Sequence, residues 1–331
     1  MRVVVVGAGV VGLTCAVRVA EAGHEAHVLA RDLPAETTSS VAAALWYPYR
    51  ALPQDKVTAW SARTYRALAE LAREPGTGVR VREGVELLGA DAPELPWWRP
   101  AVPDLATVSD PAPGFPRGWR LALPVAEMDT YLQHLVGRLE RAGGTVTRAR
   151  LAALPTSGVV VNATGLASRA LAGDSSLHPV RGQVVRVAQT GVEEWLLVSE
   201  TGPHERPLYV VPRERDVVIG GTAQDGDWTL QPDPVTAKEI LARAVELVPA
   251  LRTAEVLGHR VGLRPARPSV RLETVPHADG SPGGIVHCYG HGGAGVTLSW
   301  GCADDVLAEV EALLGTADQP VSEPAAASPR R

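Results

Sequence analysis

The sequence has very little lysine, with only Lys56 and Lys238, and its formal net charge at pH 7 is -5. This balance excludes the basic footprint of a typical nucleic-acid-binding protein. No apolar run reaches the roughly 20 residues that a transmembrane helix needs. The four valines after Arg2 lead into glycines, which is not the pattern of a secretory signal, and the chain lacks a terminal Ser-Lys-Leu. We therefore expect no membrane or nucleic-acid partner.

Cysteine is also scarce. Cys15, Cys288 and Cys302 are odd in number, and their spacing matches no zinc or disulfide pattern. We therefore expect no metal and a reducing, cytoplasmic setting, in which thiols stay free. Residues 316–331 are rich in Ala, Pro and Ser, which predicts a disordered tail. The composition leaves a homodimer open.

The opening of the chain predicts a strand, a glycine turn, a helix and a second strand. Residues 3–6 are all valine, as in a parallel strand covered on both faces, and Gly7, Gly9 and Gly12 follow. In this context the first glycine permits a tight turn, the second lets the backbone approach a pyrophosphate, and the third lets the helix pack closely. The pyrophosphate would lie at the helix N-terminus, where free N–H groups favour an anion.

The end of the second strand departs from the usual pattern. A carboxylate that binds ribose is expected about 20 residues after the glycines, and the candidates are Arg31 and Asp32. Arg31 could stack on adenine, pair with a 2′-phosphate, or be an ordinary surface arginine. These alternatives stay open on sequence grounds.

A second glycine cluster favours a flavin over a nicotinamide. Gly292, Gly293 and Gly295 open a final helix that we predict over residues 296–314. The dipole of that helix would stabilise negative charge on the pyrimidine end of a reduced flavin. An antiparallel sheet is predicted from strands at 184–187, 209–211 and 217–219, and helices from 129–142 and 240–248.

Several blocks together resemble the D-amino-acid oxidase family. They are residues 1–13, VAAALWYPY at 41–49, VNATG at 161–165, RGQ at 181–183, RPARP at 264–268 with RLE at 271–273, and YGHGGAGVT at 289–297. The blocks occur in family order, and the similarity runs from residue 1 to about residue 314.

The resemblance implies an α/β fold, with a Rossmann-like FAD-binding domain and an inserted mixed-sheet substrate domain. The implied FAD domain takes residues 1–50, 130–185 and 285–315, and the substrate domain takes 51–129 and 186–284. The implied cofactor contacts are Gly7, Gly9, Val10, Val11, Gly12, Arg31, Asp32, Thr38, Ser39, Ala42, Ala43, Ala44, Trp46, Thr164, Gly165, Arg181, Gln183, Gly292, Gly293, Gly295, Val296 and Thr297.

The resemblance also implies roles at the substrate. Arg271 matches the arginine that pairs with the substrate carboxylate, Tyr209 the tyrosine that assists it, and Gly293 the glycine whose carbonyl accepts from the amine. Tyr47 stands beside them in the pocket. Taken without the resemblance, Arg271 could instead pair with Glu273, and Tyr209 could be a structural tyrosine.

Four positions depart from the family, and one of them is Tyr47, which stands where the family has a glutamine after the loop tryptophan. Glu205 replaces a second tyrosine of the mammalian members, and Ala294 replaces the aromatic residue of the last glycine block. Ala223 stands where D-aspartate-selective relatives carry an extra arginine, which favours substrates with neutral side chains.

These residues predict oxidative deamination of a D-amino acid to a 2-oxo acid, ammonia and H2O2. With a neutral amine, hydride transfer from Cα to flavin N5 needs orientation and no side-chain base. We expect His291 to order its glycine turn. The alternatives are a glycine or sarcosine oxidase of the same fold, an NADPH-dependent reductase, and a non-catalytic FAD-binding protein.

Overall fold

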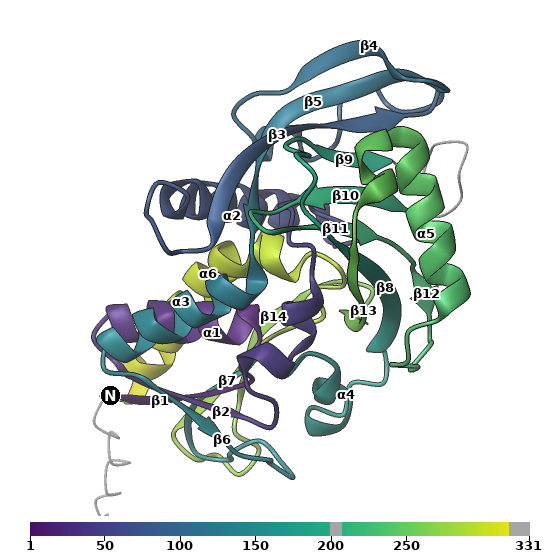
Figure 1. The fold of residues 1–331 in the computed structure, drawn as a ribbon. Helices are drawn as coiled ribbons and strands as arrows, with labels where there is room; N and C mark the ends of the chain where they lie inside the picture. Colours follow the sequence, from purple (N-terminus) through teal and green to yellow (C-terminus); the bar gives the residue numbers. More distant parts are fainter. Residues whose placement is uncertain (199–206, 318–331) are drawn as a thin grey trace, which may run out of the picture.

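The computed structural model describes residues 1–198 and 207–317, which form two β-sheets and the helices that cover them (Figure 1). The first sheet has six strands in the order β14-β15-β7-β1-β2-β6. Neighbouring strands are parallel except for the antiparallel pair β14–β15. The strands are β1 (Arg2–Val6), β2 (Glu25–Ala30), β6 (Thr145–Arg148), β7 (Gly158–Asn162), β14 (Arg271–Pro276) and β15 (Gly283–Tyr289).

The core strands of this sheet are apolar because both of their faces are covered. Val3 and Val5 of β1 are fully buried, as are Val160 and Val161 of the neighbouring strand β7. A continuous valine run suits such a position, whereas a sheet with one wet face would alternate apolar and polar residues. The predicted strand, glycine turn, helix and strand at the N-terminus are all present.

Three helices pack against the first sheet, and a fourth, α2, packs on one of them. They are α1 (Val10–Glu21), α2 (Gln54–Leu71), α3 (Met128–Arg141) and α6 (Gly295–Ala317). Helix α1 contacts both α3 and α6, and α2 lies against α6 on one side and against β3 (Val79–Leu88) and β5 (Phe115–Ala126) of the other sheet on the other (Figure 1). At Gly301 the backbone of α6 touches the backbone of Trp60 on α2, and a side chain there would collide with it.

The second sheet has nine strands in the order β12-β8-β11-β10-β9-β3-β5-β4, with β13 also paired to β8. Most neighbours are antiparallel, but β3 and β9 are parallel, so the sheet is mixed as predicted. Helix α5 (Pro234–Leu247) packs on β8, β10 and β11, and α4 (Ser168–Leu171) is a single turn. The strands are β3 (Val79–Leu88), β4 (Ala106–Ala112), β5 (Phe115–Ala126), β8 (His178–Ala188), β9 (Trp195–Val198), β10 (Leu208–Pro212), β11 (Asp216–Gly220), β12 (Gln224–Asp225) and β13 (Val256–Ala266).

The sheets divide the chain differently from the expected domain boundaries. Strand β8 begins at His178 and belongs to the second sheet, although residues 130–185 were expected in the FAD-binding domain. Strand β14 belongs to the first sheet because it forms an antiparallel hairpin with β15, although 186–284 were expected in the substrate domain. Helix α2 likewise packs on α6. No helix in the described part of the chain is long and apolar enough to span a membrane.

Candidate active site

The first glycine turn has the close backbone approaches that its sequence predicted. Gly7 ends β1 with φ of +113°, and a side chain on it would collide with the carbonyl oxygen of Ala163 after β7. A side chain on Gly12 would collide with the carbonyl oxygen of Gly7, so this glycine lets α1 begin directly against the strand. Larger residues at these two positions would push α1 away from the sheet.

The N-terminus of α1 faces a polar loop. Ser39 accepts a hydrogen bond from the backbone N–H of Val10 through its Oγ at 3.0 Å. A Cβ placed on Gly9 would lie 3.1 Å from that same oxygen, so the turn and the loop are already close. Thr38 donates to the carbonyl of Leu263 on β13 at 3.3 Å, which ties the loop to the second sheet.

At the end of β2, Arg31 and Asp32 pair with each other. Nε of Arg31 donates to Oδ1 of Asp32 at 2.9 Å, and Nη2 donates to Oδ2 at 2.5 Å. These hydrogen bonds lower the pKa of Asp32, so the carboxylate stays ionised. The Arg31 side chain is 66 % exposed, which is the geometry of a surface ion pair. A role for either residue at the adenosine remains a prediction.

The N-terminus of α6 meets that of α1. A Cβ on Gly295, the first residue of α6, would lie 3.9 Å from the side chain of Val11 and 4.0 Å from that of Val10. Two helix N-termini that converge in this way favour an anionic group between them. The glycine cradle and this convergence both fit a dinucleotide whose pyrophosphate and ring system carry negative charge.

The loop that holds residues 42–47 is fixed from two sides. Ala44 accepts from the backbone N–H of Ala126 at 3.0 Å, and the N–H of Trp46 donates to the carbonyl of Pro124 at 2.8 Å. On the other side, the hydroxyl of Thr297 accepts from the N–H of Tyr47 at 3.0 Å and donates to its carbonyl at 2.9 Å. The loop therefore joins β5 to the first turn of α6.

A cavity of about 140 Å³ lies between this loop, β10, β13 and the N-terminus of α6. Many of its walls are apolar, and it brings together residues that are far apart in the sequence. Among its lining residues are the predicted Ala42, Ala43, Ala44, Tyr47, Tyr209, Gly293, Val296 and Thr297, together with Leu45, Tyr49, Leu197, Pro207, Val211 and Arg264, which the sequence did not single out.

Arg264 is the charged residue of this cavity within the described part of the chain. Its guanidinium lies over Gly182, where a Cβ would come within 2.5 Å of Cζ, and its Nη1 donates to the carbonyl of Thr222 at 2.8 Å. Its Cδ would lie 3.4 Å from a Cβ on Gly293. No carboxylate among residues 1–198 and 207–317 forms an ion pair with it, so the remaining donors are available to an anion.

Three tyrosines complete the polar part of the cavity. Tyr209 lies opposite Gly220 on the neighbouring strand, and its ring fills the space that the missing side chain leaves. The ring of Tyr49 lies beside Gly293, with its centroid 5.9 Å from Cζ of Arg264. The hydroxyl of Tyr47 donates to the buried carboxylate of Glu86 at 2.9 Å, which holds its ring at the cavity wall.

Arg271, the predicted carboxylate anchor, does not line this cavity. It lies on β14 at the edge of the first sheet, where Nε donates to Glu273 at 2.7 Å and Nη1 to the hydroxyl of Tyr289 at 2.6 Å. Tyr289 donates in turn to Asp174 at 3.0 Å, and Arg267 donates to the same carboxylate at 2.9 Å. Burial acts to raise the pKa of Asp174, but the hydrogen bonds to its carboxylate outweigh this effect and hold that pKa well below its ordinary value.

The placement of Arg271 corrects the expectation for a physical reason. Arg271 and Glu273 are separated by two positions on one strand, so their side chains leave the same face and neutralise each other. The salt bridge weighed as the alternative role of Arg271 is therefore the one present. We call the ion-paired group of Arg271, Glu273, Tyr289, Asp174 and Arg267 the sheet-edge network.

Three predicted cofactor contacts also lie elsewhere. Arg181 is buried on β8, and its guanidinium donates to Gln183 and Gln224 and to the carbonyls of residues 229 and 231. Gln183 bonds to the backbone of Asp233, so both side chains organise the loop before α5. Trp46 is fully buried and donates to the carbonyl of Ser61, because its indole faces α2 and not the cavity.

The other predicted cofactor contacts lie in turns, and two further expectations fall outside the described residues. Thr164 bonds to Asn162 in the turn after β7, and Gly165 follows it with φ of +55°. Gly292 also has a positive φ, and its N–H donates to the carbonyl of Pro265 at 2.9 Å. Glu205 and the part of the expected tail from residue 318 onward lie outside the described residues.

Comparison with known proteins shows which family the chain belongs to. A family model described as FAD dependent oxidoreductase matches residues 2–309. The chain is 50% identical over 319 residues to the D-amino-acid oxidase of Rubrobacter xylanophilus, covering 95% of this chain and 97% of that protein. It is 43% identical over 308 residues to that of Streptomyces coelicolor, covering 92% and 95%. The structure of glycine oxidase from Geobacillus kaustophilus matches with a TM-score of 0.79 at 19% identity, covering 94% and 95%.

Proposed function

The chain belongs to the family of FAD-dependent oxidoreductases that includes the D-amino-acid oxidases, and from this premise we propose that the cavity beside Arg264 is its amino-acid site. The protein is an FAD-dependent oxidase that converts D-amino acids to 2-oxo acids, ammonia and H2O2. The observation that carries the assignment of the site is an arginine without a carboxylate partner in the described chain, on the wall of a mostly apolar cavity.

Arg264 takes the carboxylate role that the sequence suggested for Arg271. A substrate carboxylate is planar and has two oxygens, and the guanidinium matches it with a fork of parallel N–H donors. Arg264 uses one N–H donor on the carbonyl of Thr222, whereas Arg271 already donates to Glu273 and Tyr289. A partly buried cation is stabilised when an anion arrives, so this site favours binding of a carboxylate.

Tyr209 and Gly293 supply the other two contacts. Tyr209 lines the same cavity, so its hydroxyl donates a second hydrogen bond to the carboxylate. The carbonyl of Gly293 accepts from the amine, and the close approach of Tyr49 and Arg264 to its α-carbon requires a residue without a side chain. Fixed contacts to the groups around Cα select one enantiomer. The mirror-image substrate cannot make all of these contacts with the same face turned to the cofactor.

FAD, when bound, supplies the acceptor for the hydride that leaves Cα, and O2 then takes the electrons to give H2O2. The Gly7, Gly9 and Gly12 turn, the loop at 42–44 and the first turn of α6 would hold that cofactor. Within the cavity no His, Asp or Glu of the described chain stands among the lining residues. Catalysis by this chain is therefore orientation of the substrate.

The lining residues also favour a neutral substrate side chain. With Arg264 bound to the α-carboxylate, the described walls offer no second cation for an acidic side chain. Leu45, Leu197 and Val211 offer apolar surface instead, and an apolar side chain gains about 25 cal/mol for each Å² that it buries there. Alanine-, valine- and methionine-like D-amino acids are the expected substrates, ahead of D-aspartate.

H2O2 release by the purified, FAD-loaded protein tests the proposal directly. Paired D- and L-amino acids, D-aspartate, glycine and sarcosine are compared at equal concentration. We expect turnover of neutral D-amino acids and little with the L-forms or D-aspartate. Turnover confined to glycine or sarcosine would move the protein to the neighbouring oxidase class, and a higher kcat/KM for D-aspartate would refute the side-chain argument.

A further inference from the structure

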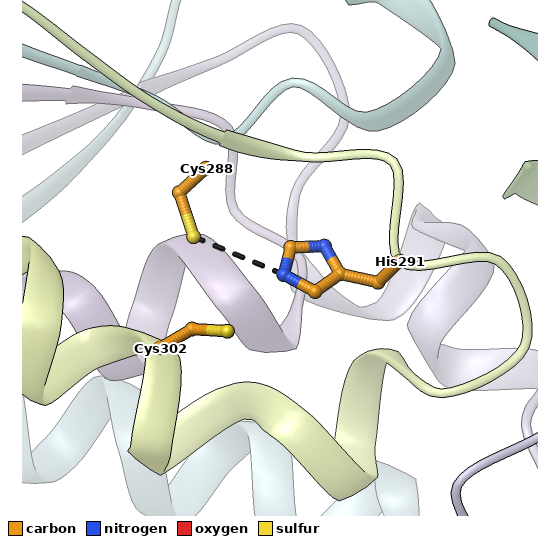
Figure 2. A group of neighbouring side chains, drawn as sticks. All are labelled: Cys288, His291 and Cys302. Atoms are coloured by element: carbon orange, nitrogen blue, oxygen red, sulfur yellow. Dashed lines mark hydrogen bonds between the residues drawn. The ribbon is translucent and has the colours of Figure 1, made fainter. Parts of the chain in front are cut away.

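A cluster of sulfur and imidazole groups lies outside the cavity and takes no part in the proposed reaction. Cys288, His291 and Cys302 point toward one another from the end of β15, the following glycine turn and α6 (Figure 2). All three are buried, with exposed fractions of 1%, 3% and 0%. Their ligand atoms, two Sγ and one ring nitrogen, all lie within 4.8 Å of one another.

A third sulfur borders this group. Cys15 lies on α1 and is fully buried, and its thiol neighbours that of Cys288. The three cysteines of the whole chain therefore meet in one place, although they are spread over α1, β15 and α6. All three are free thiols in the structure. Spacing along the chain could not reveal this, because the fold and not the sequence brings them together.

The distances suit tetrahedral coordination of a metal ion. Zinc binds thiolate sulfur at about 2.3 Å and imidazole nitrogen at about 2.0 Å, which places neighbouring ligand atoms about 3.5–3.8 Å apart. Sγ of Cys288 and Nε2 of His291 are already 3.9 Å apart, so little movement is needed there. The two ligands are three residues apart on a tight turn, a separation at which one ion can reach both.

The donor set of the cluster suits zinc. A buried thiolate needs a compensating positive charge, and thiolate with imidazole is the donor set that zinc prefers. Magnesium and calcium prefer oxygen ligands, which this cluster does not offer.

We infer that Cys288, His291 and Cys302 form a buried zinc-binding site, with Cys15 beside it. The site would join the end of β15 and the turn at His291 to α6 (Figure 2). Because its three ligands are buried, its role is structural: it fixes the glycine turn that lines the cavity. No electron transfer is involved, and zinc binding releases only the thiol protons.

Metal analysis of the FAD-loaded protein tests the inference. The protein is produced in zinc-supplemented medium and dialysed against a weak chelator. Its zinc content is then measured by inductively coupled plasma mass spectrometry. We expect about one zinc per chain, falling below about a tenth in Cys302→Ser and in His291→Asn. His277→Asn, which alters a buried histidine outside the cluster, is the matched control and is expected to keep its zinc.

Cobalt replacement gives a second readout that does not depend on activity. Co2+ bound to thiolates in a tetrahedral site gives visible d–d absorption at longer wavelength than the flavin bands, and Cys302→Ser should weaken that absorption. FAD content and circular dichroism identify variants that do not fold, so that only folded variants are compared. Folded, FAD-loaded wild type that holds no zinc and shows no cobalt absorption would overturn the inference, as would a Cys288–Cys302 disulfide in intact-protein mass spectrometry.

Discussion

Two arginines of one short segment lie in regions with opposite electrostatics. Arg264, on β13, lies on the wall of the cavity with no carboxylate partner in the described chain. Arg271, on β14, lies in the sheet-edge network with Glu273 and Tyr289. A guanidinium that is already neutralised contributes to structure, whereas one that lacks an anion can bind a substrate. The difference teaches that the surroundings of an arginine, more than its motif, decide its role.

The largest expected effect comes from Arg264→Ala. This change removes both charge-assisted hydrogen bonds to the carboxylate, each of which contributes about 1.5–3 kcal/mol. We therefore expect kcat/KM for D-alanine to fall on the order of a hundred- to ten-thousandfold. Arg264→Lys should recover only part of the loss, since an ammonium cannot form the planar fork. Steady-state H2O2 release measures both variants, and FAD content confirms that each is loaded.

Tyr209→Phe should have a smaller effect. It removes one hydroxyl from the cavity and leaves the ring that packs against Gly220. Losing one hydrogen bond to a charged group predicts a decrease in kcat/KM of roughly tenfold, expressed mainly as a higher KM. An unchanged KM in a fully FAD-loaded variant would mean that Tyr209 is only structural.

Arg271→Ala should affect stability more than activity. Its side chain is 19% exposed, and its loss leaves Glu273 and Tyr289 without their hydrogen bonds. We expect the free energy of unfolding to fall by about 1–2 kcal/mol, while kcat/KM stays within about threefold of wild type. Denaturant unfolding and steady-state kinetics on the same preparation separate the two effects. A hundredfold loss of kcat/KM at normal stability would reverse the roles of the two arginines.

Asp174 gives the sheet-edge network a pH signature. Its folded-state pKa is lowered, so its ionised form stabilises the fold above the ordinary carboxyl pKa of about 3.9. That contribution is lost as the pH falls below this value toward the folded-state pKa. Asp174→Asn should lower Tm at pH 7, and the difference from wild type should shrink below about pH 4. A constant difference across a pH series would contradict this assignment.

The sequence predicted the parts of the fold that local pattern controls. The valine strand, the glycine turn and the final helix are present, and that helix extends from Gly295 to Ala317. Helix α5 begins at Pro234, six residues before the predicted start, although Asp233 caps it and proline at the first position is a known start signal. The pairing of β14 with β15 depends on contacts between distant segments, which no local pattern carries.

The candidate site divides in the same way. Gly293, Tyr209 and the alanine loop were all singled out from the sequence, and the structure brings them to one cavity. Arg264 was missed because its block contains several arginines and resemblance alone did not separate them. One signal was available: Glu273 follows Arg271 at the same-face spacing of a strand, whereas Arg264 has no acid at that spacing. The thiol cluster carried no sequence signal at all.

The measurement that tests the central claim most directly is anaerobic reduction of the bound flavin by D-alanine, followed by stopped-flow absorbance in Arg264→Ala and Arg271→Ala. It separates substrate affinity from the rate of hydride transfer and does not depend on the reaction with O2. The account predicts that the apparent Kd for D-alanine rises at least about a hundredfold in Arg264→Ala, with Arg271→Ala close to wild type. Normal affinity in Arg264→Ala together with weak binding in Arg271→Ala would contradict it.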